Sequence, residues 1–199
     1  IESQQVQCVI ADTWKSIELC VDNLNAKKIP VICLAHGNEL YGNNFNKRER
    51  ISSILKKTSK IVVNSNFTAG LVEQLIENKR QIKVVYPGAN DFRFLEPDTS
   101  IQINGDPVLL TLSRLEKRKG HLYILQAIKK LKKQFPNIQY IIAGEGNEKT
   151  ILQHLVKEYD LHENVLFTGN VNENQKKHIF ESTTLMVMPT LDESHNRSI

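Results

Sequence analysis

Short apolar runs alternate with amphipathic stretches along the whole chain. The runs that fit strands lie at 7–11, 30–35, 60–64, 82–86, 108–112, 138–143, 164–168 and 185–188. Stretches with helical spacing lie between them, near 13–25, 45–57, 66–78, 120–134, 147–159 and 173–181. Strands that alternate with helices of this length are typical of βαβ units. The pattern therefore predicts an α/β fold built on parallel sheets.

The alternation is interrupted once, between residues 87 and 107. This segment has no clear periodicity and contains three prolines, two glycines and four acidic residues. Such a composition is typical of a connection between compact units. We therefore expect two Rossmann-like domains, over 1–95 and 96–199. Because the chain starts without Met, we expect the first domain to lack its beginning, and we expect the second domain to lack its end.

The turn after the apolar run 108–112 concentrates positive charge. Four cations occur within six residues, only one acidic residue accompanies them, and a glycine follows (Arg114, Glu116, Lys117, Arg118, Lys119, Gly120). An amphipathic segment then begins, with Leu122, Ile124, Leu125, Ile128 and Leu131 on one face. Turns at the carboxyl ends of strands in open α/β sheets are where ligands bind. The cluster predicts a site for a phosphorylated ligand; the alternative is a solvated surface loop.

Composition and charge narrow the function further. An apolar content of 40%, a charged content of 24% and a net charge of +4 describe an ordinary globular protein. The cations lie on helical faces rather than among aromatic residues, which argues against nucleic-acid binding. Lys129, Lys130, Lys132 and Lys133 form one such face. We interpret it as solvated, with peripheral contact to an anionic membrane surface as the alternative.

Cysteine and histidine usage argues against disulfides and zinc. The three cysteines have no CxxC spacing, which favours reduced thiols and a cytoplasmic location, with the inner face of the membrane as an alternative. The six histidines form no HExxH motif and no Cys/His pairing. There is also no G-x-S-x-G, no P-loop and no Asp-x-Asp motif. The common hydrolase, NTPase and metal-dependent transferase signatures are therefore missing.

A family resemblance becomes visible at the cationic turn. Ser113-Arg114-Leu115 followed by Lys119-Gly120 resembles the signature of glycosyltransferase family 4, the retaining GT-B enzymes. Further segments that resemble the family follow in its order, at 31–37, 61–68, 85–94, 142–146, 165–171 and 187–190. The interdomain segment departs from the family pattern, with Gly88 where Asn is usual and Ala89 where Gly is usual.

The resemblance implies a GT-B fold and assigns roles to particular residues. Arg114 and Lys119 would hold the diphosphate of a nucleotide-sugar donor. The loop with Gly144 and Gly146 would lie beside the nucleotide, although a strand-to-helix turn that needs small residues is an equal explanation. The main chain of Val171 would contact the base. His36 would line the catalytic cleft near the transferred sugar.

The predicted function is transfer of a sugar from a UDP- or GDP-sugar to an unidentified acceptor, without a metal or another cofactor. One alternative is a GT-B sugar-nucleotide epimerase, and another is a non-catalytic nucleotide-binding fragment. We expect the family's paired-glutamate motif to begin past Ile199 and Glu193 not to be its first member. By this prediction the 199 residues alone are inactive.

Overall fold

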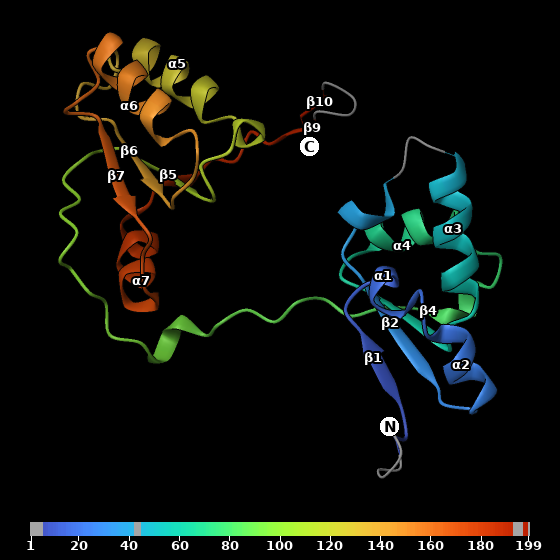
Figure 1. Ribbon diagram of the computed structural model, residues 1–199. Coiled ribbons are helices and arrows are strands. Elements are labelled where there is room, and N and C mark those ends of the chain that lie inside the picture. Colours follow the sequence, from blue (N-terminus) through green and yellow to red (C-terminus); the bar gives the residue numbers. More distant parts are fainter. Residues whose placement is uncertain (1–5, 42–44, 193–196, 199) are drawn as a thin grey trace. The chain divides into compact units, whose positions relative to one another are not determined.

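The computed structural model describes residues 6–41, 45–192 and 197–198 and divides the chain into two compact units (Figure 1). Unit 1 is Ile1–Ala89 and unit 2 is Asn90–Ile199. Each unit contains one four-stranded sheet in which all paired strands run parallel. The α/β class with parallel sheets, predicted from the alternating pattern, is confirmed.

Unit 1 has its strands in the order β1-β2-β3-β4. The strands are β1 (Val9–Ala11), β2 (Val31–Ala35), β3 (Lys60–Val63) and β4 (Ile82–Val84). The helices are α1 (Trp14–Ile17), α2 (Val21–Ala26), α3 (Phe45–Lys56) and α4 (Asn66–Glu73). Short 3-10 turns lie at Asn38–Leu40 and Lys79–Gln81. The amphipathic stretch near 13–25 forms two short helices, α1 and α2. Trp14, Ile17, Val21 and Leu24 keep helical spacing across the break, and all four are buried.

Unit 2 has its strands in the order β7-β6-β5-β8. The strands are β5 (Val108–Leu112), β6 (Gln139–Ala143), β7 (Val165–Gly169) and β8 (Leu185–Met186), the helices are α5 (His121–Leu131), α6 (Lys149–Glu158) and α7 (Glu173–Ser182), and a short antiparallel pair follows, β9 (Leu191–Asp192) with β10 (Arg197–Ser198). From β5 the chain steps outward to β6 and β7 and then returns to the other side of β5. The direction of strand addition thus reverses between β5 and β8, which makes this position a topological switch point.

The helices of unit 2 cover both faces of its sheet (Figure 1). Tyr140 and Ile142 of β6 pack with α5 and α6, whereas Ile141 and Ala143 pack with Ile179 of α7. Because α5 begins at His121, its buried face follows residues 121, 124, 125 and 128. Two members of the predicted apolar face, Leu122 and Leu131, lie at its flanks and are each 37% exposed, so that part of the prediction is wrong.

Side chains of α7 form hydrogen bonds with the backbone of the segment after Ala89. This segment contains the 3-10 turn Phe92–Phe94. Lys177 donates to the carbonyl of Leu95 at 2.8 Å, and the ring of His178 lies 3.0 Å from the carbonyl of Ile101. Among the described residues, no helix is both long enough and apolar enough to cross a membrane.

Candidate functional site

The cationic turn connects β5 to α5, as the sequence predicts. It contains a 3-10 turn at Lys117–Lys119 and then Gly120, whose φ is +74°. A Cβ atom at Gly120 would lie 2.2 Å from the carbonyl oxygen of Pro189, in the segment after β8. Only glycine fits both the left-handed backbone and this close approach. The turn is therefore held against the segment that follows β8, at the topological switch point.

A second loop, after β6, is bound to the same turn. The amide of Ser113 donates to the carbonyl of Ala143 at 3.0 Å, and the amide of Leu115 donates to the carbonyl of Glu145 at 2.9 Å. A Cβ atom at Gly144 would lie 2.1 Å from the carbonyl oxygen of Ser113, and one at Gly146 would lie 2.4 Å from that of Leu115. Close packing of two loops is thus sufficient to explain both glycines.

A pocket of about 390 Å³ opens where β5, β6 and β7 end. It is lined by Leu112, Ser113, Arg114, Ala143, Gly144, Glu145, Asn170, Val171 and Lys176. Three residues singled out in the sequence, Arg114, Gly144 and Val171, thus surround one pocket. Gly146 instead packs against the backbone of Leu115, and Lys119 lies on the turn but does not line the pocket. Within the described residues, the main-chain N–H and C=O of Val171 have no hydrogen-bond partner.

The four cations of the turn differ in their surroundings. Glu116 accepts a hydrogen bond from Nε of Arg118 at 2.7 Å, and its other oxygen lies 2.9 Å from Nη1 of Arg114. The hydrogen bond from Arg118, followed by the charges of Arg114, Arg118 and Lys119, lowers the pKa of the Glu116 carboxyl. Among the described residues, Lys119 forms no ion pair through its side chain. The turn therefore retains an excess of positive charge.

A further cation that was not predicted from the sequence, Lys176 in the first turns of α7, also lines this pocket. Its ammonium group forms an ion pair with Glu173, whose other oxygen accepts a hydrogen bond from Asn90 at 3.0 Å. These two hydrogen bonds, that of Lys176 first, lower the pKa of Glu173. The capping box between Asn172 and Gln175 could have located Lys176, because it fixes where α7 begins relative to β7.

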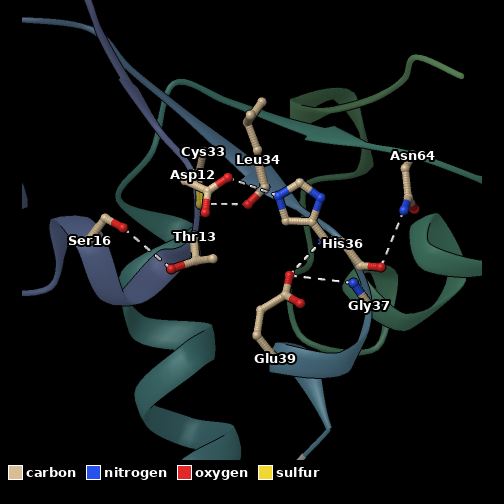
Figure 2. A network of polar contacts seen from close by, with 9 residues as sticks. All are labelled: Asp12, Thr13, Ser16, Cys33, Leu34, His36, Gly37, Glu39 and Asn64. Carbon is tan, nitrogen blue, oxygen red and sulfur yellow. Dashed lines mark hydrogen bonds and ion pairs between the residues drawn. The ribbon is translucent and has the colours of Figure 1, made fainter. Parts of the chain in front are cut away.

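In unit 1, His36 directly follows β2 and belongs to a separate polar network (Figure 2). Its Nε2 lies 3.1 Å from a carboxylate oxygen of Asp12, which follows β1. Its amide donates to Glu39 at 2.6 Å, and its carbonyl accepts from Asn64, which follows β3, at 3.3 Å. The carboxyl ends of three strands thus hold His36 in place. Asp12, Glu39 and Asn64 were not among the predicted site residues. Asp12 and Asn64 reach His36 only through the order of the strands, whereas Glu39 is three residues away along the chain.

The remaining predictions concern the cysteines, Glu193 and metal binding. Cys33 is buried, Cys20 is half-buried and Cys8 is exposed, and all three are free thiols. Glu193 lies outside the described residues. Among the described residues, no group of three or more His, Cys, Asp or Glu side chains could hold a metal ion.

Comparison with known proteins places the chain in a family. The model of the glycosyl transferases group 1 matches residues 96–195. The N-acetylgalactosamine-N,N'-diacetylbacillosaminyl-diphospho-undecaprenol 4-alpha-N-acetylgalactosaminyltransferase of Campylobacter jejuni is 31% identical over 142 residues, which cover 67% of this chain and 37% of that protein. The phosphatidylinositol N-acetylglucosaminyltransferase gpi3 subunit of Schizosaccharomyces pombe is 24% identical, over 67% of this chain and 29% of that protein.

Solved structures agree on the fold. Anabaena HepE in complex with UDP has a TM-score of 0.76 and 16% identity, and the match covers 94% of this chain and 54% of that one. The GT-B fold predicted from the sequence is thereby confirmed. The chain spans about half the length of this structural relative and a smaller share of both curated enzymes. Since the family model covers half of its residues, the chain belongs to the glycosyl transferases group 1, which is glycosyltransferase family 4.

Proposed function

We propose that the protein transfers a sugar from a UDP- or GDP-sugar to an acceptor and that unit 2 binds the donor. The observation that carries this proposal is the pocket at the switch point, where Arg114 and Lys176 approach the ends of β5, β6 and β7. Related proteins support a nucleotide ligand. Anabaena HepE was solved with UDP-glucose, and a mannosyltransferase of Mycolicibacterium smegmatis, 32% identical over 92 residues, is GDP-mannose-dependent.

Arg114 and Lys119 would stabilise the diphosphate as the bond to the sugar breaks. Negative charge accumulates on the leaving group in that step, and fixed cations can stabilise it without a metal. Arg114 offers a planar pair of donors, and Lys119 offers a compact charge. A hydrogen bond to a charged group contributes on the order of 1.5–3 kcal/mol. Loss of either side chain should therefore lower donor affinity or turnover by about one to two orders of magnitude.

The remaining predicted residues would complete the donor site. The main chain of Val171, whose amide and carbonyl are unpaired within the described residues, would contact the base. Gly144 and Gly146 would keep the loop after β6 close to the turn that carries Arg114. His36 would contact the transferred sugar from unit 1. The basic face formed by Lys129, Lys130, Lys132 and Lys133 is compatible with peripheral contact to an anionic membrane on the cytoplasmic side.

Calorimetry and product analysis on the full-length protein would test this function. We expect UDP or GDP to bind, and the matching nucleotide sugar to release its nucleotide as a glycoside forms without added divalent metal. The Arg114→Ala/Lys119→Ala double variant should lose both properties, and Lys117→Ala serves as the matched control on the same turn. Full activity of the double variant would contradict the assigned roles. Interconversion of nucleotide sugars without glycoside formation would indicate an epimerase, and binding without turnover would indicate a non-catalytic module.

A further inference from the structure

A chain of hydrogen bonds runs from the donor pocket into the core of unit 2. It begins at Ser113, which lines the pocket, and its Oγ lies 3.3 Å from Nε2 of His121. Nδ1 of His121 lies 3.0 Å from the hydroxyl oxygen of Tyr140. That hydroxyl lies 2.9 Å from Oγ1 of Thr111, which donates to the carbonyl of Val187 at 2.6 Å. His121, Tyr140 and Thr111 are each at most 2% exposed, so water does not compete with the bonds among these three side chains.

The carbonyl at the inner end fixes the direction of every bond. A carbonyl oxygen can only accept, so the Thr111 hydroxyl must donate to Val187. Oγ1 of Thr111 then accepts from Tyr140, and the Tyr140 oxygen accepts from Nδ1–H of His121. A neutral imidazole carries one proton, so Nε2 of His121 is left as an acceptor.

The opposite tautomer of His121 would cost an unsatisfied contact. With the proton on Nε2, the hydroxyl of Tyr140 would have to donate to His121 rather than to Thr111. Because the proton of Thr111 is committed to Val187, two oxygens would then face each other at 2.9 Å with no proton between them. Burial lowers the pKa of His121 below its ordinary value of 6.5; the Arg114 carbonyl opposes this effect and Lys119 adds to it. The ring is therefore neutral near pH 7.

This series of hydrogen bonds decides whether the Ser113 hydroxyl donates or accepts. Its hydroxyl faces two acceptors on the protein side, Nε2 of His121 and the carbonyl of Arg114, the latter at 3.2 Å. The single hydroxyl proton is donated to one of these acceptors at a time, and in either case Oγ has only lone pairs left for a further partner. Phosphate oxygens are themselves acceptors and do not match such a group. A ligand hydroxyl or N–H does match it.

We propose that Ser113 accepts a hydrogen bond from a hydroxyl or N–H of the donor's nucleoside, and that His121 is the positioning residue that fixes this polarity. The inference rests on the proposed function, because it assumes that a nucleotide occupies the pocket. The nucleoside is the matching part of the ligand, since Asn170 and Val171 line the same pocket and Val171 is the proposed base contact.

Nitrogen-15 NMR of the imidazole rings tests the polarity without any ligand. In the full-length protein near pH 7, Nδ1 of His121 should carry the proton and Nε2 should give the signal of an unprotonated ring nitrogen. Tyr140→Phe removes the partner of Nδ1 and should produce a mixture of tautomers, while the methyl spectrum reports whether the fold is kept. A proton on Nε2 in the wild-type protein would overturn the proposal.

Binding of inorganic pyrophosphate, UDP and GDP tests the recognition. Ser113→Ala should weaken nucleotide binding about three- to tenfold, the effect of losing one hydrogen bond, and leave pyrophosphate affinity unchanged. Tyr140→Phe should lower the same nucleotide-to-pyrophosphate ratio, a change that general loosening of the fold would not produce. Ser182→Ala is the matched control, because that hydroxyl bonds within α7 to His178.

The outcomes separate this inference from the function on which it rests. Equal losses for pyrophosphate and nucleotide, or no loss in Ser113→Ala, would overturn the role of Ser113 and leave the function intact. A wild-type protein that binds none of these ligands would overturn the function and the recognition together. Comparison of UDP with 2′-deoxy-UDP then identifies whether the ribose or the base provides the donor.

Discussion

Replacement of Gly144 by alanine should destabilise unit 2 and leave unit 1 unchanged. The φ angle of Gly144 is +135°, which side chains rarely adopt, and the new Cβ atom would lie 2.1 Å from the carbonyl oxygen of Ser113. Ordinary contact begins at 3.4 Å, so the two loops would have to separate by more than an ångström. A strained backbone of this kind costs about 1–3 kcal/mol.

Separation of the loops would also strain the hydrogen bonds that join them. The bonds from Ser113 to Ala143 and from Leu115 to Glu145 are 3.0 and 2.9 Å long. Each contributes about 1 kcal/mol, so with one or both bonds lost the total, backbone strain included, is roughly 2–5 kcal/mol, a large part of the stability of a domain. For a unit of this size we expect the melting midpoint to fall by about 8 °C or more. Nucleotide affinity should fall as well, because Arg114 lies between the two affected residues of the turn.

The assay can follow the two units separately. The only tryptophan, Trp14, is buried in unit 1, so its fluorescence follows the unfolding of that unit. Calorimetry and far-ultraviolet dichroism report both units. Gly70→Ala is the matched control, because Gly70 lies within α4 with no atom near its Cβ position. That change should stabilise unit 1 by about 0.5–1 kcal/mol. An unchanged unit 2 transition in Gly144→Ala would refute the argument from close approach.

Three further predictions follow from individual side chains. Lys176→Ala should lower nucleotide affinity several-fold in titration calorimetry, whereas Lys157→Ala on the exposed side of α6 should not. The pKa of His121 is lower in the folded state than in the unfolded state, so its contribution to stability is present above about pH 6.5 and is lost as the pH falls through the folded pKa. Urea unfolding of wild-type and His121→Asn proteins from pH 8 to 5 should show a smaller acid loss in the variant. Burial raises the pKa of Cys33 to about 12, so iodoacetamide should label exposed Cys8 and spare Cys33 in the folded protein, as mass spectrometry can show.

The eight main strands and their order of appearance could be predicted from the sequence because each is a short apolar run between polar segments. Their neighbours in the sheet could not, and much of the site depends on them. The return of β8 to the free side of β5 brings Pro189 against Gly120. Nothing in the local pattern near residue 189 indicates that contact. For the same reason, the sequence did not connect Asp12 and Asn64 with His36.

The charges of the turn were visible in the sequence, whereas the ion pairs that form among them were not. Composition predicted one carboxylate among four cations, and the structure shows that Glu116 contacts two of them. The buried side of α5 was misjudged in a related way. A histidine at position 121 has no place in an apolar pattern, yet the hydroxyls of Tyr140 and Ser113 satisfy both of its nitrogens and allow it to be buried. The face of α5 that is buried therefore depends on polar partners far apart in the sequence, which the hydrophobic pattern alone does not reveal.

The contact between Arg114 and Glu116 is compatible with a site that must release and rebind its ligand. Arg114 is 74% exposed, and an ion pair in such surroundings contributes little net stability because water solvates both charges well. A diphosphate brings more charge and more acceptors than one carboxylate, so exchange of Arg114 from Glu116 to the ligand is favourable. Glu116 would still hold Arg118 through its other oxygen, which keeps the turn ordered during the exchange. Glu116→Gln should therefore leave the diphosphate affinity unchanged or slightly raised at low salt, and a large loss of affinity would show that Glu116 is needed to orient Arg114.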